Sequence, residues 1–195
     1  MPIPLNIDLG ELADEPDELV SIASIANLAC GGQAGDAARM RCVLRLARER
    51  RTRIAAHPSY ADREGFGRRS RFEEPAAAAR SVAAQCRELA ELARQAGCPV
   101  RFVKLHGALY HDAAQDPVLA ALVLGAAHRE LSDLEAVIGP AGSAQERVAG
   151  ELGLRFLREG FADRGYDSEG KLLPRGAPGA LLLETEQVLA QAARL

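Results

Sequence analysis

Short apolar runs alternate with longer segments of helical periodicity along the whole chain. Six runs have the length of β-strands: 3–7, 24–28, 53–56, 100–103, 135–138 and 154–157. Between and after them, apolar residues recur every three or four positions, which predicts helices over 36–50, 75–96, 117–131, 143–151 and 184–194. Repeated strand and helix units of this length predict a parallel sheet with helical crossovers.

The ends of the predicted strands favour one α/β architecture over another. An open doubly wound sheet gathers its ligands at one switch point, whereas a (β/α) barrel presents loops from all its strands at one rim. Here the first, second, third, fourth and sixth runs all end in polar or glycine-rich clusters. The pattern therefore favours a TIM-like barrel. We expect one domain over residues 1–195, since no Pro/Ser-rich linker interrupts the chain.

Four ionisable residues stand at the ends of these apolar runs. Asp8 follows the first run, His57 the third, and Lys104 and His106 the fourth. Buried strands have no structural need for ionisable residues at their tips, so we expect the four side chains to surround one cavity. They suit a general base and an electrophile, or a metal-ligand set of Asp8, His57 and His106. The sequence leaves the presence of a metal open.

Two loops carry further candidate chemistry. The glycine-rich segment 29–36 leads directly into a helix, so its N–H groups suit an anion, and a tight turn capped by Asp36 explains it equally well. The long loop after His57 contains Arg68 and Arg69, and its length and charge suit a lid over an anionic substrate.

Composition narrows the class of function. The chain has 24 basic and 27 acidic residues, a net charge of −3, which gives no field that favours nucleic acid. No apolar run approaches the length of a membrane span and no basic leader precedes an apolar core, so we expect a cytoplasmic protein. The four cysteines lack Cys-x-x-Cys spacing, which fits reduced thiols packed in the protein interior. Cys30 could be a nucleophile in the glycine-rich loop, but no His follows it nearby, so we expect a packed thiol there as well.

Taken together, the motifs resemble the LamB/YcsF family, which comprises the A component of the prokaryotic ATP-dependent 5-oxoprolinase. The matching stretches are 5–11, 27–36, 56–60 through 65–69, 103–110, 161–164 and 173–175. The resemblance implies an irregular (β/α) barrel of about six to seven parallel strands, related to the polysaccharide deacetylases. It also implies work with subunits B and C to open the lactam of 5-oxo-L-proline to L-glutamate at the expense of ATP.

The resemblance implies roles for individual residues. His57 or His106 would act as general base, Lys104 would stabilise an oxyanion, and Asp8 would line the pocket with them. Candidate substrate- or phosphate-binding residues are Glu11, Asn27, Gly32, Gln33, Asp36, Arg68, Arg69, Asp163 and Arg164.

The chain departs from the family pattern in ways that keep alternatives open. The family usually has His where this chain has Gln33, and Pro where it has Leu105. Its members also continue through a further strand bearing another His. An inert relative that binds or regulates a partner, and a metal-dependent amidohydrolase like the deacetylases, are therefore the alternatives. An incomplete barrel would leave sheet edges uncovered, so we expect a homo-oligomer or a stable heteromeric complex.

Overall fold

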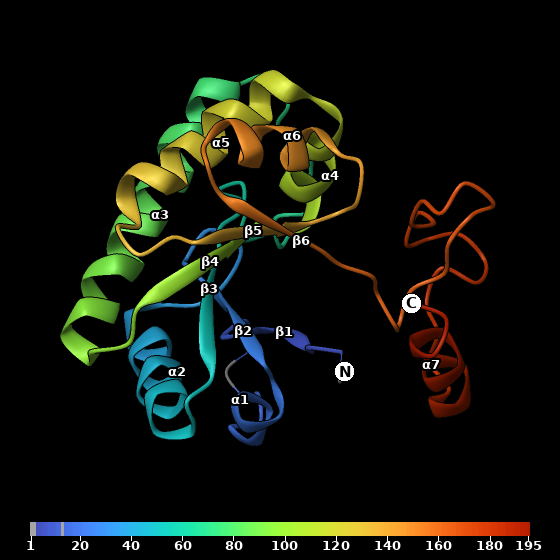
Figure 1. The fold of residues 1–195 in the computed structure, drawn as a ribbon, viewed down its shortest axis with the longest axis horizontal. Helices are drawn as coiled ribbons and strands as arrows, with labels where there is room; N and C mark the ends of the chain where they lie inside the picture. The colour runs from blue at the N-terminus through green and yellow to red at the C-terminus, as the bar shows by residue number, and fades with distance from the viewer. Residues whose placement is uncertain (1–2, 13) are drawn as a thin grey trace. The chain divides into compact units, whose positions relative to one another are not determined.

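The computed structural model describes residues 3–12 and 14–195 in two compact units. The first unit ends at Arg158 and the second is Glu159–Leu195. Figure 1 shows the strands and most helices in the first unit, and loops with one helix in the second. The prediction of one domain over 1–195 stays a prediction, and residues 1, 2 and 13 lie outside the described residues.

The first unit is built on six parallel strands in sequence order. They are β1 (Asn6–Leu9), β2 (Ile25–Ala29), β3 (Arg53–His57), β4 (Val100–Lys104), β5 (Ala136–Gly139) and β6 (Arg155–Arg158). The sheet curls into a half-barrel with helices packed around it (Figure 1). The prediction of a barrel-like α/β fold with about six parallel strands is confirmed.

The helices follow the predicted order. They are α1 (Glu18–Ile22), α2 (Ala37–Arg50), α3 (Pro75–Ala96), α4 (Gly107–Gln115), α5 (Pro117–Glu130), α6 (Ala144–Glu151) and α7 (Thr185–Ala192). The short α1 and α4 were not predicted. Asp36 caps α2 as expected, since its side chain accepts a hydrogen bond from the N–H of Arg39 at 2.8 Å.

The first strand begins later than its apolar run predicts. The run covers 3–7, whereas β1 is Asn6–Leu9. Pro4 has no N–H to donate to a ladder, and Ile3 and Leu5 are 73% and 47% exposed. Because the strand extends to Leu9, Asp8 lies inside it rather than after it.

One face of the sheet carries both a small core and the polar site. Ile25, Ala55, Phe102, Ala136 and Ile138 form a buried apolar cluster. Side chains alternate along a strand, so Asn27 lies on the same face as Ile25, and Lys104 on the same face as Phe102. The apolar cluster therefore forms the floor beneath the polar residues.

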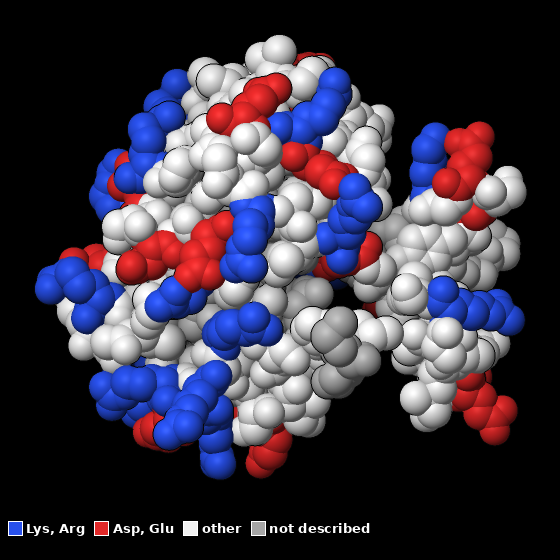
Figure 2. Space-filling model, in the orientation of Figure 1, with Lys and Arg blue, Asp and Glu red and all other residues white. Residues whose placement is uncertain are grey.

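The outer surface carries charges of both signs. Arg41, Arg45 and Arg48 of α2 are exposed, as predicted for a solvated helix face, whereas Met40, Val43 and Leu44 are buried. Figure 2 shows Lys and Arg side chains gathered where α2 lies, with acidic groups between the basic ones elsewhere. Among the described residues, no helix combines the length and apolar character needed to cross a bilayer.

The thiols give a direct test of this packing. Cys30, Cys86 and Cys98 are buried, and burial raises the pKa of each, to about 12 for Cys30. Cys42 is partly exposed. Because the thiolate is the reactive form, we expect one fast-reacting thiol per folded chain with a chromogenic disulfide reagent at pH 8, and four after denaturation. Cys42→Ser should remove the fast phase; a fast phase of two or more thiols would contradict this packing.

Candidate active site

The sheet brings the four predicted catalytic residues together. Asp8 lies in β1, and His57 and Lys104 are the last residues of β3 and β4. His106 lies just beyond β4 and directly before α4. Its backbone N–H donates a hydrogen bond to the carbonyl of Pro58 at 2.9 Å. Because these strands are parallel, their carboxyl ends meet at one edge of the sheet.

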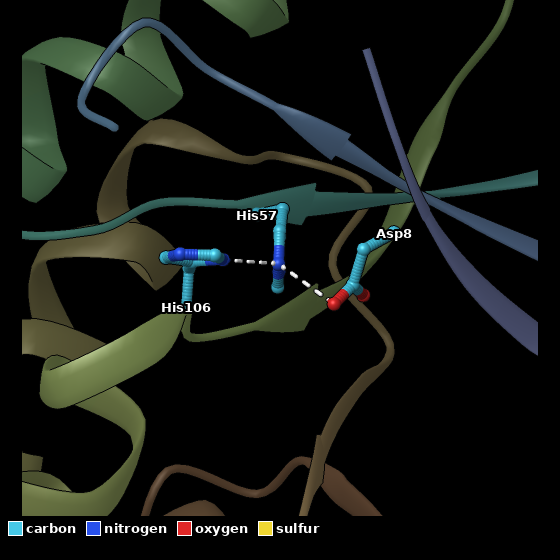
Figure 3. A group of neighbouring side chains, drawn as sticks. All are labelled: Asp8, His57 and His106. Atoms are coloured by element: carbon cyan, nitrogen blue, oxygen red, sulfur yellow. Dashed lines mark hydrogen bonds and ion pairs between the residues drawn. The ribbon is translucent and has the colours of Figure 1, made fainter. Parts of the chain in front are cut away.

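Asp8, His57 and His106 form a contiguous row (Figure 3). His57 Nε2 lies 3.4 Å from Asp8 Oδ2 and 3.0 Å from His106 Nδ1. The two imidazole rings are perpendicular, with centroids 4.9 Å apart. Both histidines are buried, whereas the Asp8 side chain is 35% exposed. The row therefore opens to solvent at its carboxylate.

Lys104 lies beside the same carboxylate. Its Nζ is 3.2 Å from Asp8 Oδ1 and 3.1 Å from Asn6 Oδ1. Asn27 Nδ2 donates to the same two oxygens, at 2.8 Å to Asp8 and 2.5 Å to Asn6. Asn6 was not predicted as a site residue, although its position two residues before Asp8 on one strand face would have indicated it.

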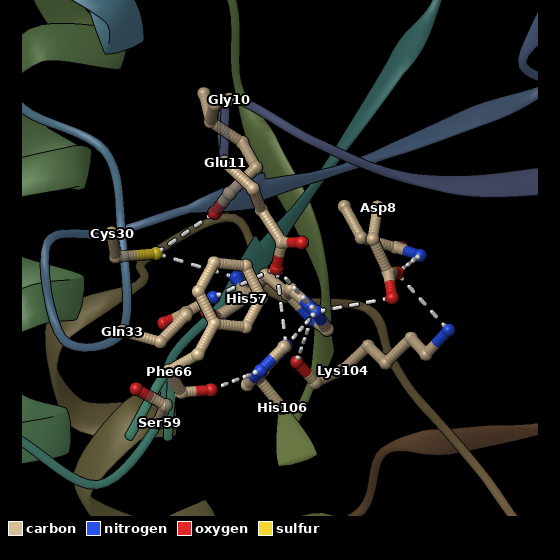
Figure 4. A network of polar contacts seen from close by, with 12 residues as sticks. Asp8, Gly10, Glu11, Cys30, Gln33, His57, Ser59, Phe66, Lys104 and His106 are labelled. Atoms are coloured by element: carbon tan, nitrogen blue, oxygen red, sulfur yellow. Dashed lines mark hydrogen bonds and ion pairs between the residues drawn. The ribbon is translucent and has the colours of Figure 1, made fainter. Parts of the chain in front are cut away.

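Glu11 and Gln33 complete the polar network (Figure 4). Glu11 Oε1 lies 3.1 Å from His106 Nδ1 and 3.8 Å from His57 Nε2. Gln33 Nε2 donates to Glu11 Oε1 at 3.2 Å and to the carbonyl of His57 at 3.3 Å. Glu11 was predicted as a binding residue, yet its contacts place it against both imidazoles.

Backbone carbonyls hold the far side of each imidazole. His57 Nδ1 is 2.8 Å from the carbonyl oxygen of Lys104, and His106 Nε2 is 3.0 Å from that of Phe66. The Phe66 carbonyl reaches the ring because Phe66 and Gly67 both have positive φ, 54° and 65°. A Cβ at Gly67 would lie 3.1 Å from His106 Cδ2, so this turn packs directly on the imidazole.

The charges of the cluster stabilise one another. Burial raises the pKa of Asp8, but His57, Lys104 and hydrogen bonds outweigh burial and hold its pKa well below its usual range. Burial also raises the pKa of Glu11, and contacts with His106 and His57 bring it below its ordinary value. Burial lowers the pKa of His57, but the Asp8 carboxylate reverses that effect and raises it.

The glycine-rich segment 29–36 supports the site from behind. It is a tight turn, with the N–H of Gly31 donating to the carbonyl of Ala34 at 2.8 Å. Gly32 packs against Gln85 and Ser59 with no room for a Cβ. Cys30 is fully buried and its thiol lies 3.0 Å from the carbonyl of Leu28, which agrees with a packed thiol rather than a nucleophile.

In the long loop after β3, Arg68 contacts an aromatic ring next to the site and Arg69 pairs with a glutamate of the loop. Arg68 stacks over Phe66, 4.9 Å from the ring centroid, and Phe66 itself contacts the His106 ring. Arg69 pairs with Glu64 at 3.0 Å and is 60% exposed. Their binding of an anionic substrate stays a prediction, and Arg68 is connected to the site through Phe66.

Two further predicted binding residues belong to the second unit. The Arg164 guanidinium donates to the carbonyls of Ala180 at 3.0 Å and Leu173 at 2.7 Å. The carbonyl of Asp163 accepts a hydrogen bond from the N–H of Leu182 at 2.9 Å. These contacts organise the unit, and binding of substrate by Asp163 and Arg164 stays a prediction.

The chain is similar in sequence to proteins of one known family. The LamB/YcsF family model matches residues 3–195. The A component of 5-oxoprolinase from Nocardia farcinica is 44% identical over 198 residues, which cover 98% of this chain and 78% of the relative. The corresponding 5-oxoprolinase component of Symbiobacterium thermophilum is 44% identical over 200 residues, 97% of this chain and 74% of the relative.

A solved structure agrees with the fold. The crystal structure of the lactam utilization protein from Thermus thermophilus superimposes with a TM-score of 0.87 and 34% sequence identity. The match covers 100% of this chain and 80% of that one. Sequence and structure therefore agree that this chain belongs to the LamB/YcsF family.

Proposed function

We propose that the chain is a component of an ATP-dependent 5-oxoprolinase that opens the lactam of 5-oxo-L-proline to L-glutamate. The names of its relatives, a 5-oxoprolinase component and a lactam utilization protein, support this reaction class. The observation that carries the proposal is the convergence of Asp8, Lys104, His57 and His106 at one edge of the sheet. Such a concentration of acid, base and cation is typical of an active site.

The reaction explains the need for ATP. An unstrained five-membered amide is a poor electrophile, and transfer of the γ-phosphoryl group to its oxygen makes the carbon open to attack. One water adds to that carbon, the ring C–N bond breaks, and the nitrogen takes up a proton, which leaves the side-chain carboxyl group as an acyl phosphate. A second water hydrolyses the acyl phosphate to the carboxylate of glutamate and inorganic phosphate. We propose that ATP is used together with partner subunits, the B and C components of the enzyme.

The residues of the site suit the two charge movements in this sequence. Lys104 offers a buried ammonium group for negative charge that develops on the lactam oxygen. The cluster of Asp8, Glu11, His57 and His106 offers acceptors for the proton of the attacking water. We propose that the guanidinium of Arg68, which lies over the Phe66 ring, binds a carboxylate or phosphate of the substrate.

The activity is tested by mixing the chain with the two partner subunits. We expect release of glutamate from 5-oxo-L-proline only when ATP is present. Lys104→Met should lower kcat/KM by about 10²- to 10³-fold because it removes the cation facing the developing charge. His128→Ala, at an exposed position of α5, serves as the matched control and should leave the rate unchanged.

Two outcomes would count against the proposal. One is a mixture that stays inactive although every chain is folded. The other is unchanged turnover in folded Lys104→Met. Tight binding of 5-oxo-L-proline without turnover would instead support the alternative of an inert binding relative.

The association state is a separate prediction. In the described part of the chain, β1 and β6 are the edges of the sheet, and Leu5 and Ile22 are 47% and 60% exposed. Unpaired sheet edges within the first unit and apolar side chains in solvent favour association, so we expect a dimer, or a heteromer when partner subunits are present. Light scattering after size-exclusion chromatography measures the mass of the particle in solution. Leu5→Lys should weaken the association because it places a charge at an exposed apolar position. A monomer at micromolar concentration, alone and with partners, would contradict the expectation.

A further inference from the structure

The backbone determines which ring nitrogens carry protons in the histidine pair. A carbonyl oxygen only accepts hydrogen bonds, so the atoms that face carbonyls, His57 Nδ1 and His106 Nε2, must be N–H donors. In neutral rings the other two atoms, His57 Nε2 and His106 Nδ1, then carry lone pairs. These two atoms face each other at 3.0 Å. Two lone pairs at that distance repel unless a positive ion lies between or beside them.

The carboxylates add to this concentration of acceptors. Asp8 Oδ2 lies 3.4 Å from His57 Nε2, and Glu11 Oε1 lies 3.1 Å from His106 Nδ1. The two carboxylates together carry two negative charges, and Lys104 beside Asp8 supplies one positive charge. With both imidazoles neutral, four acceptor atoms therefore converge with net negative charge around them, and either a proton or a metal ion can neutralise that charge.

We propose that Asp8, His57 and His106 bind one divalent transition-metal ion. Their ligand atoms all lie within 4.8 Å of one another. Metal bonds of about 2.0–2.1 Å at tetrahedral angles would place ligand atoms about 3.3–3.4 Å apart. The His57–His106 and His57–Asp8 separations of 3.0 Å and 3.4 Å are close to that spacing. The ligand atoms of Asp8 and His106 lie within 4.8 Å of each other and would move closer together around a bound ion.

The surroundings match those of metal-binding histidines. Such a histidine almost always donates its second ring N–H to a carboxylate, a backbone carbonyl or a water. Both His57 and His106 meet this condition through the carbonyls of Lys104 and Phe66. Two imidazole ligands favour zinc, iron or nickel over magnesium and calcium, which prefer oxygen ligands. Three protein ligands also leave a coordination position open, as in catalytic rather than structural sites.

The inference changes the roles within the cluster. A bound ion would supply Lewis-acid chemistry, and His57 and His106 would hold it instead of acting as general bases. Glu11, which Gln33 holds beside His106, is then the carboxylate available to accept a proton. The metal site itself rests on ligand geometry and does not depend on the proposed 5-oxoprolinase reaction.

The test is direct binding of metal to the purified full chain. After treatment with a chelator, the chain is titrated with Zn²⁺ by calorimetry and with Co²⁺ by visible absorption, which reports the coordination geometry. We expect one ion per chain and a Co²⁺ spectrum of low coordination number. Asp8→Asn, His57→Ala and His106→Ala should each weaken binding by at least about a hundredfold, since even outer partners of a metal site contribute about 10- to 100-fold.

Matched controls separate loss of a ligand from loss of the fold. His128→Ala removes an exposed histidine of α5 and should bind Zn²⁺ like the unmodified chain. Asp8→Asn keeps the shape of the side chain, so it covers the case in which a histidine variant fails to fold by circular dichroism. Absence of Zn²⁺ and Co²⁺ binding up to millimolar concentration would overturn the inference, as would unchanged affinity in folded Asp8→Asn and His106→Ala.

The same measurements distinguish this inference from the proposed function. Stoichiometric metal binding without glutamate formation would uphold the metal site and count against the 5-oxoprolinase assignment. ATP-dependent glutamate formation by a chain that binds no metal would support the 5-oxoprolinase assignment and overturn the metal site. In that case a proton shared between His57 and His106 would be what balances the cluster.

Discussion

The site depends on two backbone carbonyls that fix two imidazole rings. The carbonyl of Lys104 holds Nδ1 of His57, and the carbonyl of Phe66 holds Nε2 of His106. The Lys104 carbonyl is positioned by the end of strand β4. The Phe66 carbonyl is positioned by a turn in which Phe66 and Gly67 both have positive φ. These two hydrogen bonds orient the rings so that His57 Nε2 and His106 Nδ1 face each other, with Asp8 beside the first nitrogen and Glu11 beside the second.

The same region contains polar atoms that the described chain leaves unsatisfied. Asn27 Oδ1 and Gln33 Oε1 are buried without a hydrogen-bond partner among the described residues. Each amide is oriented by its NH₂ group, which donates to two acceptors of the site. Asn27 thus holds Asp8 and Gln33 holds Glu11, so both buried amides position carboxylates of the site, as expected where a fold supports chemistry rather than packing alone.

The strands, the long helices and the convergence of Asp8, His57, Lys104 and His106 were predictable because they depend on periodicity and on the shared end of parallel strands. The contact of Glu11 with both imidazoles was not, since a flexible side chain beyond a strand has no fixed direction in sequence. The Phe66 carbonyl was also beyond prediction, because any residue carries that group and only the backbone turn aims it. The short helix α4 was not predicted because it begins at Gly107, and glycine has a low helix propensity.

Gln33, where the family usually has His, has a physical explanation in this chain. Its Nε2 faces two acceptors, Glu11 Oε1 and the carbonyl of His57, and an amide NH₂ group has one proton for each. A neutral imidazole has a single N–H and would serve only one of them. The amide thus fixes Glu11 beside His106 without titrating. The substitution does not by itself indicate an inert protein, because the residue at this position acts on the site through Glu11.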